Sequence, residues 1–554
     1  MYQYDDLDRQ VVSDRVQQFK GQMARYLAGE LSEEAFLPLR LQNGLYIQKE
    51  SPMLRIAIPY GMISSRQLRK LADIANQYDR GYCHITTRQN VQFNWVEIEQ
   101  VPGILNELAT VDMHAIQTSG NCIRNTTCDP LAGVAQDEIA DPRPFCEIIR
   151  QWSTLHPEFA FLPRKFKVAV IGAKEDRAAI QLHDIGLQLI RDSSGEIGFK
   201  VWVGGGQGRT PMLATPIRNF LPQAQLLAYL KAILRVYNRY GRRDNKYKAR
   251  IKILVSALGA ENFTHQVEAE FTRTCSPEYL LTLEEIEYAQ SFFTVPIYAN
   301  NNPQTVRINQ QSQQQQTQYE RWLTRNVHAH RIADYAVVSL SLKAPGQAPG
   351  DINAAQLLQV ADLAERYSHA EVRTTQQQNL ILADVKKSDL YALWTEASGI
   401  DLAMPTIGTL ADIVCCPGGD FCGLANTRSL PVSAAIQQRF DNLDFLYDLG
   451  DLSLKISGCI NACAHHHIAN IGILGVDKNG QEFYQITLGG EAGNTSRLGK
   501  VLGPSLPMDD VPEAIARVVE LYLEERTDEQ ETFSSAYQRI GKQPFKDKVY
   551  ATDN

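Results

Sequence analysis

The sequence predicts an α+β protein whose chain contains two copies of one two-part unit. Helix-forming segments alternate with short β-branched segments, and the same local patterns occur twice in the same order. The patterns are a helical segment (67–78 and 356–367), a threonine pair (86–87 and 374–375), an Ile-Gly pair (185–186 and 471–472) and a Gly-Gly pair (204–205 and 489–490). This repetition predicts a molecule with internal two-fold pseudo-symmetry.

The first repeated element is an amphipathic helix. QLRKLADIANQY (67–78) and QLLQVADLAERY (356–367) share Gln, Leu, Ala, Asp, Ala and Tyr at matching positions. Apolar residues recur at helical spacing in both copies, so each helix has one face that must be buried. These residues are Leu68, Leu71, Ala72 and Ala75 in the first copy and Leu357, Val360, Ala361 and Ala364 in the second. A turn and the threonine pair follow, in TTRQN (86–90) and TTQQQN (374–379).

These patterns divide the chain into six segments. The polar, glutamine-rich stretch NNPQTVRINQQSQQQQTQ is typical of a surface linker between the two copies. The predicted segments are an N-terminal extension (1–45), a first half-unit (46–118), a first larger domain (119–300), the linker (301–325), a second half-unit (326–405) and a second larger domain (406–554).

The composition is that of an intracellular enzyme with several domains. At 554 residues and 62.2 kDa, the chain is too long for one hydrophobic core. A formal charge of −8 argues against nucleic acid as a partner. The first twenty residues are charged, and no apolar run approaches the length of a membrane span. We therefore expect a cytoplasmic protein with no membrane partner. The ten cysteines are few and unevenly placed, which argues against a disulfide framework and for a metal or redox role.

Four cysteines near the C-terminal end form two tight pairs. Cys416 and Cys422 lie in CPGGDFC, and Cys459 and Cys463 lie in CINAC. Small and turn-forming neighbours let backbone N–H groups approach a sulfur-rich centre, and four thiolates without harder ligands suit iron and sulfur. A structural zinc ion is the alternative, but paired zinc ligands are usually two to four residues apart, which fits these spacings poorly.

The two copies differ in their chemistry. An alignment of the copies places Cys128 opposite Cys416 and Arg124 opposite Asp412, while Arg88 of TTRQN meets the glutamines of TTQQQN. The C-terminal copy thus carries the cysteines, and the N-terminal copy carries the cations. A redox centre facing a cationic wall suits an anionic substrate or cofactor.

These residues resemble the siroheme-dependent sulfite and nitrite reductases, and most of all the assimilatory sulfite reductase hemoprotein (beta) branch of that family. The resemblance extends from about residue 45 to near the C-terminus. TTRQN, IRN, LPRKFK, VGGGQG and SGCINAC followed by HHHIANIG occur in the order found in the family. It implies two ferredoxin-like half-units forming one pseudo-symmetric domain, plus two α/β domains that hold siroheme and the iron-sulfur cluster.

The resemblance also implies the cofactor ligands. In the family, four cysteines hold a 4Fe-4S cluster and the last of them also bridges to the iron of siroheme, which makes Cys463 the expected bridging ligand. Such a shared thiolate couples an electron reservoir to the iron that binds substrate. Arg88 and Gln92 resemble family positions that contact the macrocycle, Asn461 is similarly placed, and Thr86 is a weaker candidate.

The same comparison assigns four substrate-binding cations. They are Arg55 in MLRIAIP, Arg124 in CIRNTTC, and Lys165 and Lys167 in PRKFK. If Lys165 and Lys167 begin a strand, their side chains alternate onto one face and can both point at one oxyanion. The alternative reading of the two lysines is an exposed basic strand end. Three consecutive histidines at 465–467 cannot all face one ion in regular structure, so we expect packing roles for them.

The predicted function is assimilatory sulfite reduction, in which six electrons convert sulfite to sulfide. Assimilatory nitrite reductase is the nearest alternative, and Lys167 separates the two because nitrite enzymes of the family usually carry asparagine there. A non-catalytic iron-sulfur electron carrier is a remote alternative that would have no use for the four cations. No flavin or nicotinamide motif is present, so we expect a separate electron donor, either ferredoxin or an NADPH-dependent flavoprotein.

Overall fold

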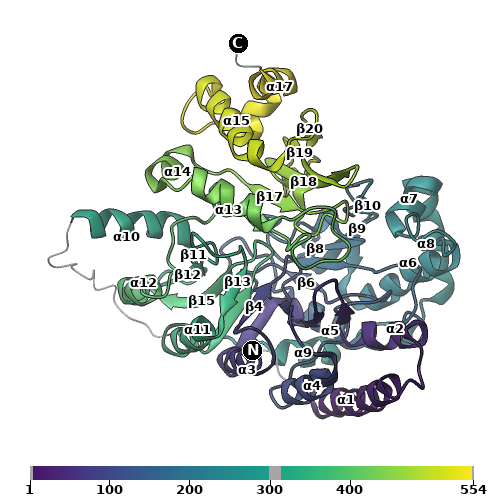
Figure 1. The fold of residues 1–554 in the computed structure, drawn as a ribbon. Helices are drawn as coiled ribbons and strands as arrows, with labels where there is room; N and C mark the ends of the chain where they lie inside the picture. The colour runs from purple at the N-terminus through teal and green to yellow at the C-terminus, as the bar shows by residue number, and fades with distance from the viewer. Residues whose placement is uncertain (1–3, 299–312, 552–554) are drawn as a thin grey trace.

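The structure is a computed structural model that describes residues 4–298 and 313–551. Four five-stranded sheets organise these residues, two in a central domain and one in each larger domain. In Figure 1, the N-terminal helices lie at the bottom, the first larger domain lies to the right and the second lies at the top. The expected α+β class with an internal repeat is confirmed.

Each sheet of the central domain takes one edge strand from the other repeat. The strand orders are β1-β2-β5-β4-β13 and β11-β12-β15-β14-β3, so β13 of the second copy pairs with β4, and β3 of the first copy pairs with β14. This exchange makes one domain of two half-units. The strands are β1 (Leu45–Ile47), β2 (Pro52–Ile56), β3 (Met62–Ser64), β4 (Tyr82–Ile85), β5 (Val91–Phe93), β11 (Val327–Ala329), β12 (Tyr335–Leu340), β13 (Asp351–Asn353), β14 (Glu371–Thr374) and β15 (Leu380–Lys386).

The repeated amphipathic helices are α3 (Ser65–Tyr78) and α11 (Ala354–Tyr367). Ser64 and Asn353 begin them with the same reciprocal capping box, in which each cap side chain accepts from a backbone N–H three residues later. The two helices pack against each other and bury their apolar faces in one core shared by both half-units. The central-domain core also takes in α4 (Val101–Ala109) and α12 (Leu390–Ser398).

The N-terminal extension forms two helices, α1 (Asp6–Leu27) and α2 (Glu33–Gln42). α1 packs against α4 of the central domain. The carboxylate of Asp8 also accepts hydrogen bonds at 2.8 and 2.9 Å from Arg150 of the first larger domain. The extension is thereby joined to both domains.

The two larger domains contain matching sheets with the orders β10-β9-β8-β7-β6 and β16-β17-β18-β19-β20. In each sheet, the first three strands in chain order are parallel and the last two are antiparallel. The strands are β6 (Thr127–Cys128), β7 (Val168–Ile171), β8 (Ile185–Arg191), β9 (Ile197–Val203), β10 (Thr215–Pro222), β16 (Val414–Cys415), β17 (Leu454–Ser457), β18 (Ile471–Lys478), β19 (Gln481–Leu488) and β20 (Lys500–Val501).

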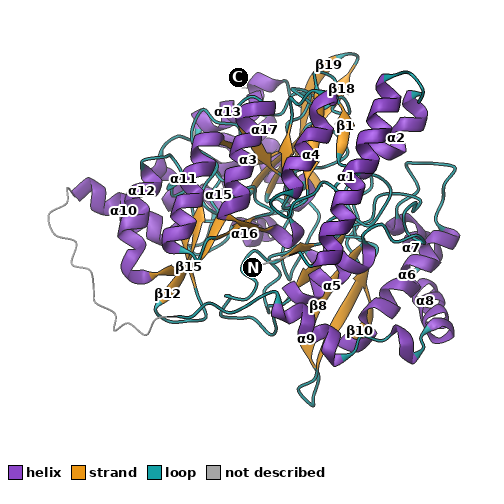
Figure 2. Cartoon of the chain, turned by 90° about the horizontal axis from the view of Figure 1, so that it is seen from below, coloured by secondary structure: helices purple, strands orange, loops and turns teal. Residues whose placement is uncertain are grey.

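Helices cover both larger sheets. Figure 2 shows α5 and α9 on one side of the sheet that contains β8 and β10, with α6, α7 and α8 on the other. The helices are α5 (Arg143–Ser153), α6 (Leu226–Tyr240), α7 (Ile251–Leu258), α8 (Ala260–Thr274), α9 (Leu283–Ser291), α13 (Leu430–Arg439), α14 (Leu443–Leu449), α15 (Val511–Glu525), α16 (Phe533–Ile540) and α17 (Lys542–Tyr550). Within the described ranges, no helix combines the length and apolarity needed to cross a bilayer.

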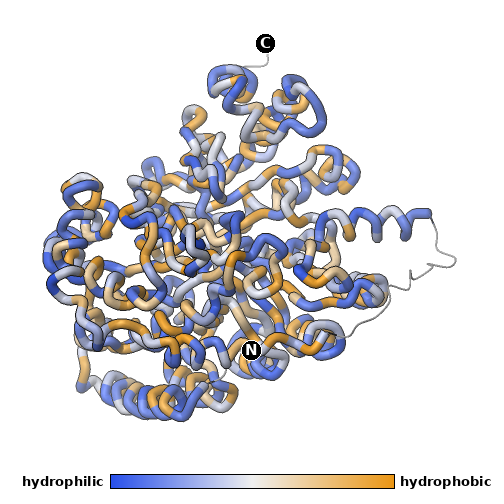
Figure 3. Tube along the Cα trace, turned by 180° about the vertical axis from the view of Figure 1, so that it is seen from behind, coloured by the Kyte–Doolittle hydropathy of each residue, from blue (hydrophilic) through white to orange (hydrophobic). Residues whose placement is uncertain are grey.

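The expected linker at 301–325 is helical from Gln313 onward, in α10 (Gln313–Asn326). Residues 301–312 lie outside the described residues. α10 is largely hydrophilic in Figure 3, yet it buries Tyr319 and Trp322 against the central-domain core. Glutamine is a good helix former, so a glutamine-rich composition alone does not distinguish a linker from a helix held by two aromatic side chains.

Candidate active site

The four cysteines come from two loops at the same end of one sheet. Cys416 and Cys422 lie in the loop that follows β16, and Cys459 and Cys463 lie in the loop that follows β17. β16 and β17 are adjacent and parallel, so the two loops leave the sheet side by side. A Cβ atom on Gly458 would lie 2.7 Å from the Cα of Gly418, and this close contact between the loops requires glycine.

The cysteine side chains interact as one group. Burial raises the pKa of Cys416 to about 12, and the charge of Cys463 acts in the same direction. Burial also raises the pKa of Cys422 and of Cys459, and Cys463 again adds to the effect. Such thiols become thiolates only when a positively charged metal centre stabilises the anion, as iron does.

Two of these sulfur atoms accept hydrogen bonds, as expected for cluster ligands. The backbone N–H of Gly458 donates to Sγ of Cys416 at 3.2 Å, and Nδ2 of Asn461 donates to Sγ of Cys459 at 3.5 Å. The Asn461 side chain thus lies at the cluster side of the site. In the described part of the chain, no three His, Cys, Asp or Glu side chains converge as they would around a single ion.

Lys165 and Lys167 lie just before β7 rather than inside it. Phe166 between them is fully buried and forms a parallel bridge with Ile123, so the segment is extended and both lysines point away from that core. Among the described residues, neither ammonium group has a hydrogen-bond partner. Lys165 and Lys167 therefore lie on the same face of the extended segment, as expected, although the regular strand begins only at Val168.

Both lysines lie close enough to Cys463 of the other repeat for its charge to act on them. Burial lowers the pKa of Lys165 to about 8, against the opposing effect of the Cys463 charge. Burial also lowers the pKa of Lys167 well below its usual range, and the charges of Arg88 and Lys165 add to this effect. Both lysines are half-buried, and a partly desolvated cation with no protein partner is costly, so a bound anion removes that cost.

Arg55 and Arg124 lie side by side and share an acceptor. The carbonyl oxygen of Thr118 accepts from Nη1 of Arg124 at 2.9 Å and from Nη1 of Arg55 at 3.4 Å. Gly120 O accepts from Nε and Nη2 of Arg124 at 3.0 and 2.7 Å. Gln92 Oε1 accepts from Nη2 of Arg55 at 2.9 Å, so Gln92 orients Arg55. These neutral acceptors hold both guanidinium groups without cancelling their charge.

Arg88 is fixed at the ends of the first parallel strands. It donates to Oγ1 of Thr127 at 2.9 Å and to the carbonyl of Asn125 at 2.6 Å. Burial lowers the pKa of Arg88 to about 9, and the Arg124 charge acts in the same direction. The guanidinium therefore belongs to the same cationic group.

Thr86 and Thr87 have different roles in the TTRQN turn. Oγ1 of Thr86 accepts from the backbone N–H groups of Arg88 and Asn90, so this hydroxyl stabilises the turn itself. Oγ1 of Thr87 instead donates to the carbonyl of Cys463 at 2.7 Å. Thr87 therefore fits a role at the cofactor better than the expected Thr86.

Sequence reasoning missed the acid that organises the wall. Asp184 is fully buried, accepts from Nε and Nη2 of Arg250, and accepts the backbone N–H of Lys167 at 2.8 Å. Lys252 donates to the carbonyls of Gln207 and Thr210 at 2.7 and 2.5 Å and so holds the VGGGQG loop. In the sequence, the only indication that Arg250 and Lys252 belong to the site was their Arg-x-Lys spacing, which repeats the Lys-x-Lys spacing of 165 and 167.

The charge balance fits an anionic cofactor together with an anionic substrate. Arg55, Arg88, Arg124 and the two lysines form a cationic wall beside Cys463, while Asp184 is committed to Arg250. Both amide atoms of Gln207 are buried without a partner among the described residues, as are both ring nitrogens of His466. Unpaired buried polar groups require a ligand or water. The residues therefore fit a carboxylate-bearing macrocycle.

The matching loops of the first repeat contain an ion pair instead of cysteines. Gln89 Oε1 accepts from the N–H of Cys128 at 2.9 Å, as Gln378 Oε1 accepts from the N–H of Cys415. Cys128 therefore corresponds to Cys415, and the expected pairing with Cys416 is wrong by one residue. The two turns match without an insertion, since Thr86 and Thr375 make the same hydrogen bonds, and the error arises because the segments between turn and cysteine differ in length by two residues.

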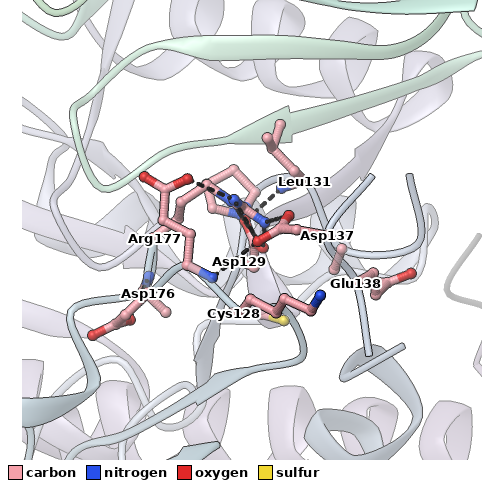
Figure 4. Close-up of polar contacts among 12 residues, drawn as sticks. Cys128, Asp129, Leu131, Asp137, Glu138, Asp176 and Arg177 are labelled. Atoms are coloured by element: carbon pink, nitrogen blue, oxygen red, sulfur yellow. Dashed lines mark hydrogen bonds and ion pairs between the residues drawn. The ribbon is translucent and has the colours of Figure 1, made fainter. Parts of the chain in front are cut away.

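Asp129 therefore takes the place of Cys416 in the first repeat. Ala179 and His465 both have a left-handed backbone conformation at the end of the second loop, so they correspond to each other. Arg177 and Cys463 each lie two residues earlier, so Arg177 takes the place of Cys463. Asp129 and Arg177 form an ion pair at 2.9 Å, and Asp137 also binds Arg177 at 2.9 Å (Figure 4). The first repeat thus contains a salt bridge where the second contains proposed cluster ligands.

The position that corresponds to the cationic wall in the second repeat has a different charge. Asn470 accepts from the N–H of Ser453 at 2.9 Å, as Asp184 does from the N–H of Lys167, so Ser453 matches Lys167. A cavity of about 340 Å³ lies there, lined by residues that include Gln377, Asp451, Ser453, Lys455 and Asn470. The lining also includes Asp412 and Glu491, so its carboxylates outnumber Lys455 and the position lacks the positive charge needed for the same anionic cofactor.

Known protein families match both parts of each repeat. The nitrite and sulphite reductase 4Fe-4S domain matches residues 119–274 and 408–553, and the nitrite/sulfite reductase ferredoxin-like half domain matches residues 46–111 and 330–398. The chain belongs to the nitrite and sulfite reductase family. It is an oxidoreductase that uses siroheme coupled to a 4Fe-4S cluster, and the zinc alternative is wrong.

Similar proteins of this family include enzymes for both anions. A protein named sulfite reductase (ferredoxin) 1 from Mycolicibacterium paratuberculosis is 28% identical over 87% of this chain and 81% of its own length. The assimilatory ferredoxin-dependent nitrite reductase of Haloferax mediterranei is 28% identical over 86% of this chain and 80% of its own length. The structure of the Mycobacterium tuberculosis NirA protein has a TM-score of 0.76 and 25% identity, covering 94% of this chain and 92% of that one.

Proposed function

We propose that this reductase converts sulfite to sulfide with six electrons. The observation that carries the proposal is the second lysine of the cationic wall, Lys167, which lies close to Cys463 with no hydrogen-bond partner among the described residues. Sulfite is partly a dianion at neutral pH, whereas nitrite carries one charge. One additional ammonium group therefore favours sulfite.

In this proposal, Cys416, Cys422, Cys459 and Cys463 would hold the 4Fe-4S cluster, and Cys463 would also be a ligand of siroheme. When bound, the two cofactors supply single electrons to the substrate. Arg88, Gln207 and Lys252 lie where they can bind or position groups that receive the macrocycle carboxylates. Thr87 fixes the main chain of Cys463.

The cationic wall binds the substrate oxygens. Arg55 and Arg124 are held by neutral acceptors and keep their charge, so they orient and neutralise the oxyanion. A lysine can also transfer a proton. Because the pKa of Lys165 is lowered to about 8, its ammonium group is a stronger acid than an exposed lysine.

Ferredoxin is the proposed electron donor. The similar sulfite and nitrite reductases bear names that specify ferredoxin. The side chain of Leu424, two residues after Cys422, is 71% exposed, so the proposed cluster loop reaches the surface where a donor protein can approach. This proposal favours ferredoxin over an NADPH-dependent flavoprotein.

Steady-state turnover tests both parts of the proposal. The purified holoenzyme is assayed with sulfite and with nitrite, using reduced ferredoxin or an NADPH-dependent flavoreductase. We expect a higher kcat/KM for sulfite, and turnover with ferredoxin. A higher kcat/KM for nitrite would reassign the substrate, and turnover with the flavoreductase alone would reassign the donor.

A further inference from the structure

Tyr46 is a phenol enclosed by the cationic wall. It lies on the edge strand β1 and is partly buried. Its ring centroid lies 5.3 Å from Cζ of Arg55, and the side chain of Ser119 lies near its hydroxyl. Neither the repeated patterns nor the family motifs in the sequence pointed to this residue.

Close backbone packing holds β1 against the wall. Gly44 precedes the strand with a positive φ of 74°, and a Cβ atom there would lie 2.4 Å from the carbonyl oxygen of Arg55. The Gly44 carbonyl accepts from the N–H of Arg55 at 3.1 Å. Arg40 donates to the carbonyl of Leu45 at 3.2 Å. The position of Tyr46 is therefore determined by the same backbone that carries Arg55.

The charges that act most strongly on Tyr46 are positive. Arg124, Arg55 and Lys165 interact with the phenol, and Arg164 faces it as well. Burial alone would raise the pKa of Tyr46, but these three cations outweigh burial and lower it below the usual range. A phenolate formed here is stabilised by its surroundings.

We propose that Tyr46 is a catalytic proton donor to the departing oxygen of the substrate. The inference rests on the proposed function, because it requires an oxyanion bound to Arg55, Arg124 and Lys165. An arginine cannot deliver the proton because it remains protonated. A lysine that delivers one loses the positive charge that binds the substrate, whereas Tyr46 delivers a proton and leaves all the cations charged.

The step balances for each oxygen removed. Two electrons come from the donor protein and two protons are taken up, and the oxygen leaves as water. The O–H bond of Tyr46 breaks as a new O–H bond forms on the departing oxygen, whose bond to sulfur or nitrogen is broken. Solvent provides the second proton, and water reprotonates the phenolate.

Tyr46→Phe tests the proposal while keeping the aromatic ring beside Arg55. Loss of a general acid lowers kcat by about 100-fold, whereas KM stays within about two-fold. Siroheme and iron contents stay at the wild-type level. Tyr26→Phe is the matched control, because its hydroxyl binds Glu33 on the exposed surface of α1 and α2, and it leaves kcat unchanged.

A second readout does not depend on turnover. The tyrosinate absorbance of the holoenzyme is titrated with pH for wild type and for Tyr46→Phe. We expect the difference between them to show one phenol with a pKa below the ordinary value of about 10. A wild-type enzyme that reduces neither anion would refute the proposed function, while the titration would still test the environment of Tyr46.

Three results would overturn the proposal. The first is a Tyr46→Phe enzyme that retains kcat within about two-fold of wild type. The second is an ordinary or raised pKa for Tyr46 in the titration. The third is a loss of siroheme in proportion to the loss of activity, which would make Tyr46 a structural residue.

Discussion

The hydroxyl of Thr87 donates a 2.7 Å hydrogen bond to the carbonyl of Cys463, which joins the TTRQN turn of the first repeat to the loop of the proposed bridging cysteine. Thr87 lies in the half-unit that also carries Arg88 and Arg55. This contact sets the proposed cluster loop against the cationic wall and so helps to hold the two halves of the site in register.

Thr87→Val should weaken that register. The change keeps the shape of the side chain but leaves the Cys463 carbonyl without its donor, at a cost of about 1 kcal/mol. We expect siroheme to be released at a lower temperature, measured by the loss of its absorbance on heating. Thr110→Val, which removes an exposed hydroxyl bonded to Glu107, is the control. Equal release temperatures for all three proteins would contradict the role of Thr87.

Cys422→Ser should abolish the iron-sulfur cluster. One thiolate of the proposed four is lost, and a neutral serine hydroxyl is a poor ligand for iron. We expect non-haem iron to fall from about four per chain to near zero and siroheme retention to fall with it. Cys415→Ala is the matched control, because Cys415 is fully buried in β16 and corresponds to Cys128. A Cys422→Ser protein with full iron content would remove Cys422 from the ligand set.

Arg177→Met should destabilise the first larger domain. Asp129, whose side chain is 1% exposed, then loses its main cationic partner, and such a loss typically costs about 3 kcal/mol. Denaturant unfolding measures the change. Removing both charges, in Arg177→Met with Asp129→Asn, should restore part of the stability. Arg242→Met, which breaks an exposed pair with Asp244, should leave the free energy of unfolding nearly unchanged. Equal costs for the two single arginine variants would show that the buried pair has no special role.

Glu138 makes the stability of the protein depend on pH. Burial raises its pKa to about 7. The folded state therefore binds a proton that the unfolded state has released between about pH 4.5 and 7, so the free energy of unfolding falls as pH rises through this window. Between pH 5 and pH 8, the free energy of unfolding of Glu138→Gln should rise by about 2 to 3 kcal/mol relative to that of wild type. Parallel stability profiles for the two proteins would contradict the raised pKa.

The sequence predicted the elements that depend on local pattern. The repeated helices, the cysteine pairs and the alternation of Lys165 and Lys167 are each visible within a few residues. The contacts across the repeats were not predictable in this way. Thr87 meets Cys463, and Asp184 meets Arg250, only after the sheets have formed. Tyr46 lies outside every motif because its environment comes from β1, β2 and two loops.

The alignment of the repeats shows the same limit. Cysteine identity placed Cys128 opposite Cys416, whereas the backbone hydrogen bonds to Gln89 and Gln378 place it opposite Cys415. Loops change length without changing the strands they connect, so sequence alone could not fix this register. The corrected register reveals the ion pair of Asp129 and Arg177.

The substrate preference of Lys167→Asn, compared with wild type, tests the central claim most directly. The change removes one charge from the wall and leaves a shorter hydrogen-bond donor. Loss of a charge-assisted contact in the transition state costs about 2 to 4 kcal/mol, or roughly 30-fold to 1,000-fold in rate. We predict that sulfite turnover falls by at least the smaller factor, that nitrite turnover falls less or rises, and that siroheme and iron contents stay unchanged. The exposed Lys174→Asn serves as the control. An equal loss for both anions, or no loss for sulfite in a fully loaded enzyme, would contradict the account.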